Sequence, residues 1–296
     1  MPQDNNQPNT ASLDKDQLKN FTFITETLEK LGMGKVFDQV LRTGMLAGDP
    51  VIEKAAKFTF ENPDGMARVT PRFERTEGDL GGHFYLLKGF RESLLDKEGK
   101  ETVSQFLPVF KKTGFTVEEG RNLLEGRAVL NRVFPMDGDP YTRYTRINFD
   151  EKTENGNFKL DNRNAANLDF DLAKGLSAIP FARSLTQQEK EDVGRKLEKG
   201  YEHIFQKRGP NNSFERMRLY AIPHEGQLAT VDSNGELKTY PANRVNMRAV
   251  GVLEETSQQT QGQPDRKNLD KAAETAQKME EGQGKDQKPG QRKKAA

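Results

Sequence analysis

The chain has 296 residues, of which 46 are basic and 45 acidic, and a formal net charge of +1. Charges this balanced give no global field to attract nucleic acid or an anionic membrane, so any such contact requires a local patch. Cysteine is absent, which excludes disulfides, thiolate metal sites and a cysteine nucleophile.

Both ends of the chain have the composition of disordered segments. Residues 1–12 are rich in Asn, Gln and Pro, and residues 254–296 consist mainly of Gln, Glu, Lys and Gly. No apolar run reaches the roughly 18 residues that a membrane-spanning helix needs, and the polar start lacks the apolar segment of a signal peptide. We therefore expect a cytoplasmic protein that makes no membrane contact, with disorder at both ends.

The first ordered region is predicted to be a pair of helices over residues 13–50. Apolar residues recur at the three- and four-residue spacing of one helix face, at Leu18, Phe21, Ile24, Leu28 and Leu31. A second helix is expected from Lys35 to about Leu46. Gly48-Asp49-Pro50 closes the pair, since proline cannot continue a helix.

Residues 51–253 are expected to form an α+β core of antiparallel strands and short capped helices. Alternation and turn signals predict its first strands over 57–60, 67–74, 83–95 and 101–111. In this group, Leu86 and Phe90 would share one strand face, and Pro108 indicates an edge strand or a bulge.

Capping signals and hairpin signals divide the rest of the core. Thr116 with Glu119, and Thr186 with Glu189, are capping boxes that each predict the start of a helix. Asn155-Gly156 predicts a hairpin with a type I′ turn. A further helix is predicted over 168–179, and strands over 127–134, 141–149, 201–206, 214–222, 227–231, 236–240 and 245–250. One hypothesis divides this core near residues 150–167 into two units, each with strands and a capped helix.

No stretch of the sequence has the pattern of a known catalytic or cofactor site. The three histidines, His83, His203 and His224, are far apart, and none begins a His-Glu-x-x-His pattern. Neither a Gly-x-Ser-x-Gly turn nor a phosphate-binding loop after a strand occurs. We therefore expect no metal and no cofactor.

The strand over 141–149 is the best candidate for a binding surface. Alternation would place Tyr144 and Arg146 on a polar face and turn Ile147 and Phe149 to the core. Rings and guanidinium groups on a sheet can stack on bases and neutralise phosphates. An alternative is that these groups form ordinary cross-strand pairs with Asp and Glu. With neighbouring strands, the candidate binding residues are Arg127, Arg132, Arg143, Tyr144, Arg146, Lys207, Arg208, Arg216 and Arg218.

One motif resembles a known family. The segments Gly114-Phe115-Thr116 and Asn122-Leu123-Leu124-Glu125-Gly126-Arg127-Ala128-Val129 resemble the central motif of an uncharacterised Bacteroidota family, often encoded near conjugative and other mobile elements. The resemblance covers roughly residues 13–250 and implies no catalytic residues. Where relatives read Asn-Tyr-Gly-Phe-Asp-Leu, residues 166–172 of this chain lack the tyrosine. The gene neighbourhood of that family implies a role in DNA mobility, host interaction or defence.

The leading hypothesis is a non-enzymatic accessory protein of a mobile element that contacts protein or nucleic acid through the sheet face. One alternative is a nucleic-acid-processing hydrolase whose carboxylates converge only in the fold. Another alternative is a structural subunit of a larger assembly, which would expose an extended apolar patch.

Overall fold

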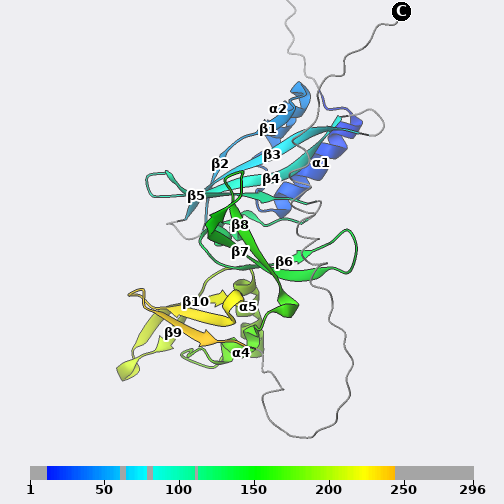
Figure 1. Ribbon diagram of the computed structural model, residues 1–296. Helices are drawn as coiled ribbons and strands as arrows, with labels where there is room; N and C mark the ends of the chain where they lie inside the picture. The colour runs from blue at the N-terminus through cyan, green and yellow to red at the C-terminus, as the bar shows by residue number, and fades with distance from the viewer. Residues whose placement is uncertain (1–11, 61–64, 79–82, 111–112, 244–296) are drawn as a thin grey trace, which may run out of the picture. The chain divides into compact units, whose positions relative to one another are not determined.

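The computed structural model describes residues 12–60, 65–78, 83–110 and 113–243, and these contain five α-helices and twelve strands (Figure 1). All strand pairs among them are antiparallel, and the strands form three sheets. The predicted α+β class is confirmed. The described residues belong to one unit, Met1–Val245. Within them, no helix is both long and apolar enough to cross a bilayer.

Two helices, α1 (Lys15–Lys30) and α2 (Asp38–Ala47), open the described chain. Ile24 and Leu28 of α1 are buried as predicted, but Leu18 is 48% exposed. At about 100° per residue, Leu18 lies roughly 120° round the helix from Ile24. The buried face of α1 is therefore narrower than the predicted apolar face. The second helix begins at Asp38 and not at Lys35, because residues 34–37 form a turn.

The first sheet has the order β1-β3-β4-β5, and β2 also pairs with β3. β5 lies at an edge of this sheet, as Pro108 at its end indicates. The sequence did not predict β1. The strands are β1 (Val51–Glu53), β2 (Ala56–Thr59), β3 (Met66–Glu77), β4 (His83–Leu95) and β5 (Glu101–Pro108).

A β-bulge between β3 and β4 changes which residues of β4 face the core. The register shifts between Arg72 and Phe73, opposite Gly89. The extra residue reverses the alternation, so Phe90 is fully buried while Leu86 is 39% exposed. The prediction that these two side chains share one face is therefore wrong.

α3 (Val117–Leu124) lies between the first and second sheets and contacts β4, β5, β6 and β7. Its predicted capping box forms, with Glu119 N–H donating to Thr116 Oγ1 and Thr116 N–H donating to Glu119 Oε2. The second sheet has the order β6-β7-β8. Its strands are β6 (Val129–Val133), β7 (Tyr141–Lys152) and β8 (Phe158–Asn164).

The Asn155-Gly156 hairpin between β7 and β8 forms, but the predicted type I′ turn is wrong. Gly156 has a φ of +76°, whereas Asn155 is not among the residues of positive φ. A type I′ turn needs positive φ at both central residues. The loop closes instead with Thr153 N–H donating to the carbonyl of Asn157, 2.7 Å away.

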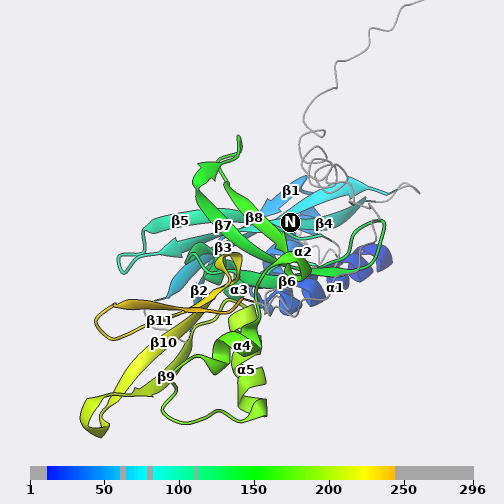
Figure 2. The same ribbon diagram turned by 60° about the horizontal axis from the view of Figure 1, so that its bottom comes forward.

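The third sheet has the order β12-β11-β10-β9, and α4 and α5 pack on one of its faces (Figure 2). The predicted helix over 168–179 is only as long as α4, because Asp171 caps its start by accepting from Lys174 N–H. The elements are α4 (Leu172–Ser177), α5 (Gln187–Glu198), β9 (His203–Arg208), β10 (Phe214–Ile222), β11 (Gln227–Val231) and β12 (Leu237–Pro241). The strand predicted over 245–250 and the two predicted tails lie outside the described residues, apart from Ser12.

Two clusters of buried apolar side chains hold these elements together. The first joins α1, α2, the first sheet and α3, and the second joins α4, α5 and the third sheet. β6 and β7 contribute to both clusters: Val129 and Ile147 belong to the first, Tyr144 belongs to the second, and Leu130 packs against the second. A division of the core near residues 150–167 stays a prediction.

Candidate functional site

Tyr144 is buried and does not lie on an exposed binding face. Its side chain is 5% exposed and packs edge-on against Phe170, with ring centroids 5.8 Å apart. Burial raises the pKa of the phenol, and Glu198 adds to this shift. The predicted exposure of Tyr144 is therefore wrong, because the second cluster covers this face of β7. Phe149, predicted to face the core, is 42% exposed and packs against Phe158.

Arg127 belongs to a joint between two helices. Its guanidinium donates to Oδ1 of Asn122 at 2.5 Å and pairs with Glu125. Asn122 is 3% exposed and donates from Nδ2 to the carbonyl oxygen of Lys199, 2.9 Å away at the end of α5. The central motif therefore has a structural role here, and Arg127 is not free for a partner.

Three more of the predicted basic residues pair with carboxylates, and the pairs of Arg146 with Asp161 and Lys207 with Glu215 are cross-strand pairs, as in the alternative. The other two carboxylates lie outside the strands, Glu202 just before β9 and Glu225 in the turn between β10 and β11. The pairs are Arg146 with Asp161 at 3.3 Å and Glu225 at 3.4 Å, Lys207 with Glu215 at 3.0 Å, and Arg218 with Glu202 at 3.9 Å.

Arg132 and Arg143, on the second sheet, have no carboxylate partner among the described residues. Arg132 lies over the ring of Phe134, with Cζ 5.0 Å from the centroid. Arg143 is partly buried, and burial lowers the pKa of its guanidinium against the opposing effect of Tyr141. The two arginines point to opposite faces of the sheet, because Arg132 pairs with Thr142, the neighbour of Arg143. They do not form one surface.

The outward face of β9 and β10 does bring guanidinium groups and a ring together. Arg208 lies directly opposite Phe214, and Arg216 and Arg218 follow Phe214 at two-residue spacing. Such side chains share one strand face. All four are exposed, Phe214 by 60%. We call these four residues the arginine face.

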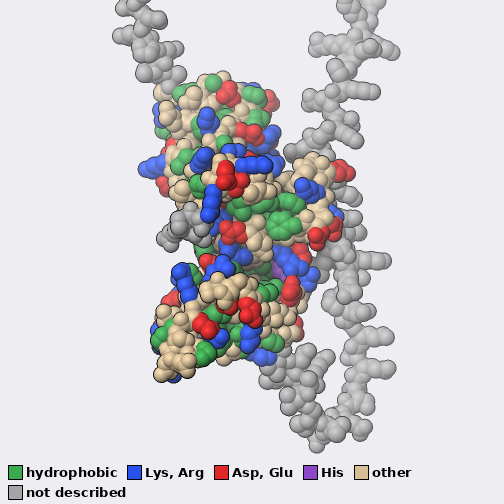
Figure 3. Space-filling view, turned by 90° about the vertical axis from the view of Figure 1, so that its left-hand side faces the viewer, with side chains coloured by type: hydrophobic (Ala, Val, Ile, Leu, Met, Phe, Trp, Pro, Cys, Tyr) green, Lys and Arg blue, Asp and Glu red, His purple; other side chains and the backbone are tan. Residues whose placement is uncertain are grey.

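The arginine face is a local excess of positive charge. No carboxylate oxygen of the described residues lies within 4.0 Å of Arg208 or Arg216. On the side of the molecule shown in Figure 3, basic and acidic side chains are interspersed. Sequence reasoning named the three arginines but missed Phe214, although the alternation Phe214, Arg216, Arg218 is visible in the printed sequence.

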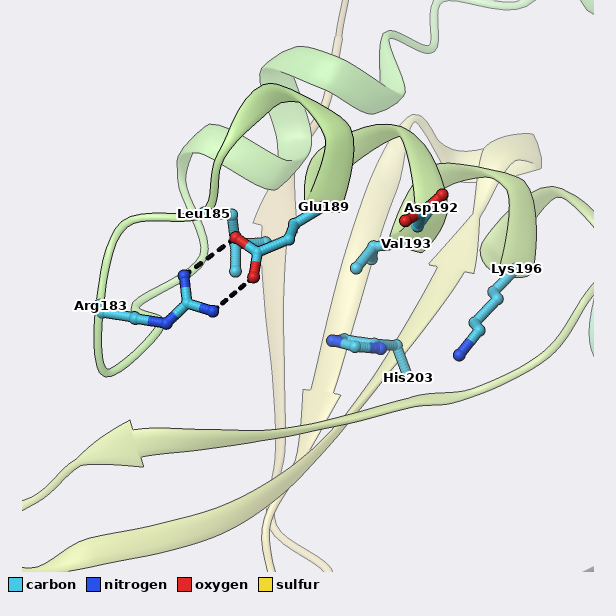
Figure 4. Close-up of a pocket in the computed structure, with 7 residues that line it drawn as sticks. All are labelled: Arg183, Leu185, Glu189, Asp192, Val193, Lys196 and His203. Carbon is cyan, nitrogen blue, oxygen red and sulfur yellow. Dashed lines mark hydrogen bonds and ion pairs between the residues drawn. The ribbon is translucent and has the colours of Figure 1, made fainter.

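A cavity of about 250 Å³ lies on the opposite side of this sheet, between α5 and β9 (Figure 4). Its helix wall consists of residues at positions i, i+3, i+4 and i+7, which share one helix face. His203 of β9 lies across from them, and the preceding loop adds Arg183 and Leu185. The helix residues are Glu189, Asp192, Val193 and Lys196.

Glu92 of β4 is a fully buried carboxyl group beneath α3. Its side chain is 0% exposed, and neither carboxyl oxygen has a hydrogen-bond partner among the described residues. A Cβ built on Gly120 of α3 would overlap Oε2 of Glu92. Burial raises the pKa of Glu92 well above its usual range, against the opposing effect of Arg121. Because α3 covers Glu92, substitutions of Glu92 report on how α3 packs against β4.

The described residues contain no group of three or more His, Asp or Glu side chains placed to hold a metal ion. Comparisons of the chain with protein-family models, curated proteins and solved structures find no match. The resemblance to the Bacteroidota family stays a prediction.

Proposed function

We propose that the chain is a non-enzymatic binding protein that contacts nucleic acid through the arginine face. The observation that supports this function is the placement of two exposed, uncompensated guanidinium groups, Arg208 and Arg216, around the exposed ring of Phe214. A role as an accessory protein of a mobile element is part of the same proposal and rests on the family resemblance.

The chemistry of the arginine face favours a single-stranded nucleic acid over a protein partner. Guanidinium groups bind phosphate oxygens in a bidentate way, and each contact releases counterions. Phe214, 60% exposed, offers a flat surface on which an unpaired base can stack. Bases in a duplex are already stacked on each other, so the ring gains this contact only with a single strand.

Replacing both unpaired arginines is expected to weaken binding to single-stranded DNA or RNA. The plot of log affinity against log salt concentration has a negative slope. For Arg208→Gln with Arg216→Gln, the magnitude of this slope is expected to decrease by about 1.4, because each lost phosphate contact removes about 0.7 for single strands. Fluorescence anisotropy with labelled oligonucleotides, from low to moderate salt, measures this slope. The matched control is Arg42→Gln with Arg91→Gln, which removes the same charge from two exposed arginines on α2 and β4.

Two outcomes contradict this proposal. One is that the wild-type chain shows no micromolar binding to any oligonucleotide at low salt. The other is that the control pair lowers the affinity and the salt slope as much as the arginine-face pair. Gel analysis of the same mixtures tests the hydrolase alternative, which requires shortened oligonucleotides, and sedimentation of the protein alone tests the structural-subunit alternative.

Phe214→Ala is expected to reduce the affinity for single strands about tenfold, since stacking of one base contributes about 1–3 kcal/mol. Phe214→Tyr retains the ring and should bind like the wild type. Phe110→Ala removes another exposed ring, 68% exposed and next to β5, and serves as the control. The same anisotropy titration measures all three variants. Equal affinities of Phe214→Ala and the wild type would exclude stacking on this ring.

A further inference from the structure

The carboxylates that line the cavity between α5 and β9 already have cationic or polar partners. Glu189 accepts hydrogen bonds from Arg183 and from Thr186 N–H, and these contacts lower the pKa of its carboxyl group to about 2. Asp192 pairs with Arg195 and accepts from Gln188 at 3.2 Å. Both acids therefore have their charge compensated within the protein.

The two remaining polar groups of the cavity, Lys196 and His203, have no such compensation. Lys196 has no ion pair among the described residues, and its positive charge lowers the pKa of His203 in addition to the larger effect of burial. The imidazole lies parallel to the ring of Phe205 and edge-on to Phe181, with centroids 6.5 and 6.4 Å apart. Its nitrogen atoms have no described hydrogen-bond partner, so both remain available to a ligand.

The cavity also has an apolar part. Leu185 and the buried Val193 line it beside the polar groups, and Figure 4 shows Leu185 near the Arg183–Glu189 pair and Val193 near His203. Its volume of about 250 Å³ is just below the range of typical ligand pockets, about 300–1,000 Å³. A phosphate ion alone would leave much of this space unused, whereas a small organic group would fill it.

We propose that this cavity binds a small phosphomonoester, with the phosphate group at Lys196 and His203 and the organic group against Leu185 and Val193. Lys196 supplies charge-assisted hydrogen bonds, and His203 donates from an imidazole N–H. The proposal is independent of the arginine face, because His203 and Arg208 point to opposite faces of β9.

Binding of an anion here has a direct effect on His203. The charged groups that line the cavity with it are Lys196, Asp192 and Glu189 from α5 and Arg183 from the loop, while β9 and β10 present Phe205 and Leu219. A bound anion stabilises the imidazolium form and offsets the repulsion from Lys196, so it raises the pKa of His203. A ligand of constant charge therefore binds more tightly as the pH falls through that pKa.

The test is an NMR titration of the histidine side chains in the full chain. Phenyl phosphate is the main probe, inorganic phosphate tests the need for the organic group, and phenyl sulfate keeps its charge from pH 5.5 to 7.5. His203 is assigned among the three histidines with His203→Gln. We expect phenyl phosphate to shift the His203 signals with millimolar or tighter affinity, and phenyl sulfate to raise the His203 pKa.

Matched lysine variants separate this site from general attraction of anions to the chain. Lys196→Gln should weaken phenyl phosphate binding about tenfold or more, as expected for loss of a charged hydrogen bond. Lys199→Gln removes the same charge from the end of α5, outside the cavity, and should bind like the wild type. The Arg208→Gln, Arg216→Gln variant should also bind phenyl phosphate normally, so that failure of one proposal is distinguishable from failure of the other.

Three results would overturn the proposal. The His203 signals would not move with millimolar phenyl phosphate, Lys199→Gln would lose as much affinity as Lys196→Gln, or inorganic phosphate would bind as tightly as phenyl phosphate. Circular dichroism of each variant shows that the protein is folded, so a negative titration counts against the site itself.

Discussion

Glu92→Leu is expected to stabilise the protein by about 2 kcal/mol at pH 7. A buried polar group without a hydrogen-bond partner costs about 1–3 kcal/mol, and Glu92 has no described partner for either oxygen. Leucine has a similar size and would pack against Leu107, which lines the same space below Gly120. Urea denaturation of the wild type and the variant at pH 7 measures this difference.

The same substitution is expected to change how stability depends on pH. Because burial raises the pKa of Glu92 in the folded state, the folded chain retains a proton that the unfolded chain releases. Stability therefore falls as the pH rises above the ordinary value of 4.5, by up to about 1.4 kcal/mol per pH unit, until the pH exceeds the folded-state pKa. Glu92→Leu removes this contribution.

The control for Glu92 is Glu98→Leu, which replaces an exposed glutamate in the loop between β4 and β5. Denaturation from pH 4.5 to 8 should give the control the same pH dependence as the wild type. Parallel stability curves for Glu92→Leu and the wild type would show that Glu92 does not retain its proton in the folded protein.

The features that sequence alone predicted correctly depend on neighbouring residues. The two predicted capping boxes form because their side chain and backbone partners are three residues apart in the chain. β4 has the predicted bounds, and Pro108 marks an edge strand, since a missing N–H is tolerated there. Local chemistry is sufficient for the class of the fold.

The errors occur where distant segments decide the environment of a side chain. Alternation shows that β7 has two faces, but it does not show which face α5 and the third sheet cover, and Tyr144 is buried for that reason. Glu92 follows Arg91 and precedes Ser93, a polar context that suggests solvent exposure, yet α3 covers it. The cavity at His203 likewise depends on how α5 packs against β9, which no motif encodes.

The joint at Asn122 is the second site where a large effect on stability is expected. Asn122→Ala removes the acceptor for Arg127 and the donor to the carbonyl oxygen of Lys199, 77 residues away in sequence. The carbonyl oxygen of Lys199 loses its partner, which costs about 1–3 kcal/mol, and Arg127 loses one hydrogen bond but keeps Glu125, so we expect a total loss of roughly 2–4 kcal/mol. Asn122→Asp retains an acceptor for Arg127 but places a carboxylate beside the carbonyl oxygen, and it should also destabilise the protein.

Urea denaturation measures these losses, and Asn155→Asp, at an exposed loop position, is the control, with an expected change within about 0.5 kcal/mol. A double-mutant cycle of Asn122→Ala with Arg127→Ala should give a coupling of about 0.5–3 kcal/mol, because the two side chains are directly bonded. If Asn122→Ala costs no more than the control and the coupling is zero, the central motif is not a joint between α3 and α5. Arg127 would then keep only its pair with Glu125, and it would join Arg208 and Arg216 as a residue to test for nucleic-acid binding.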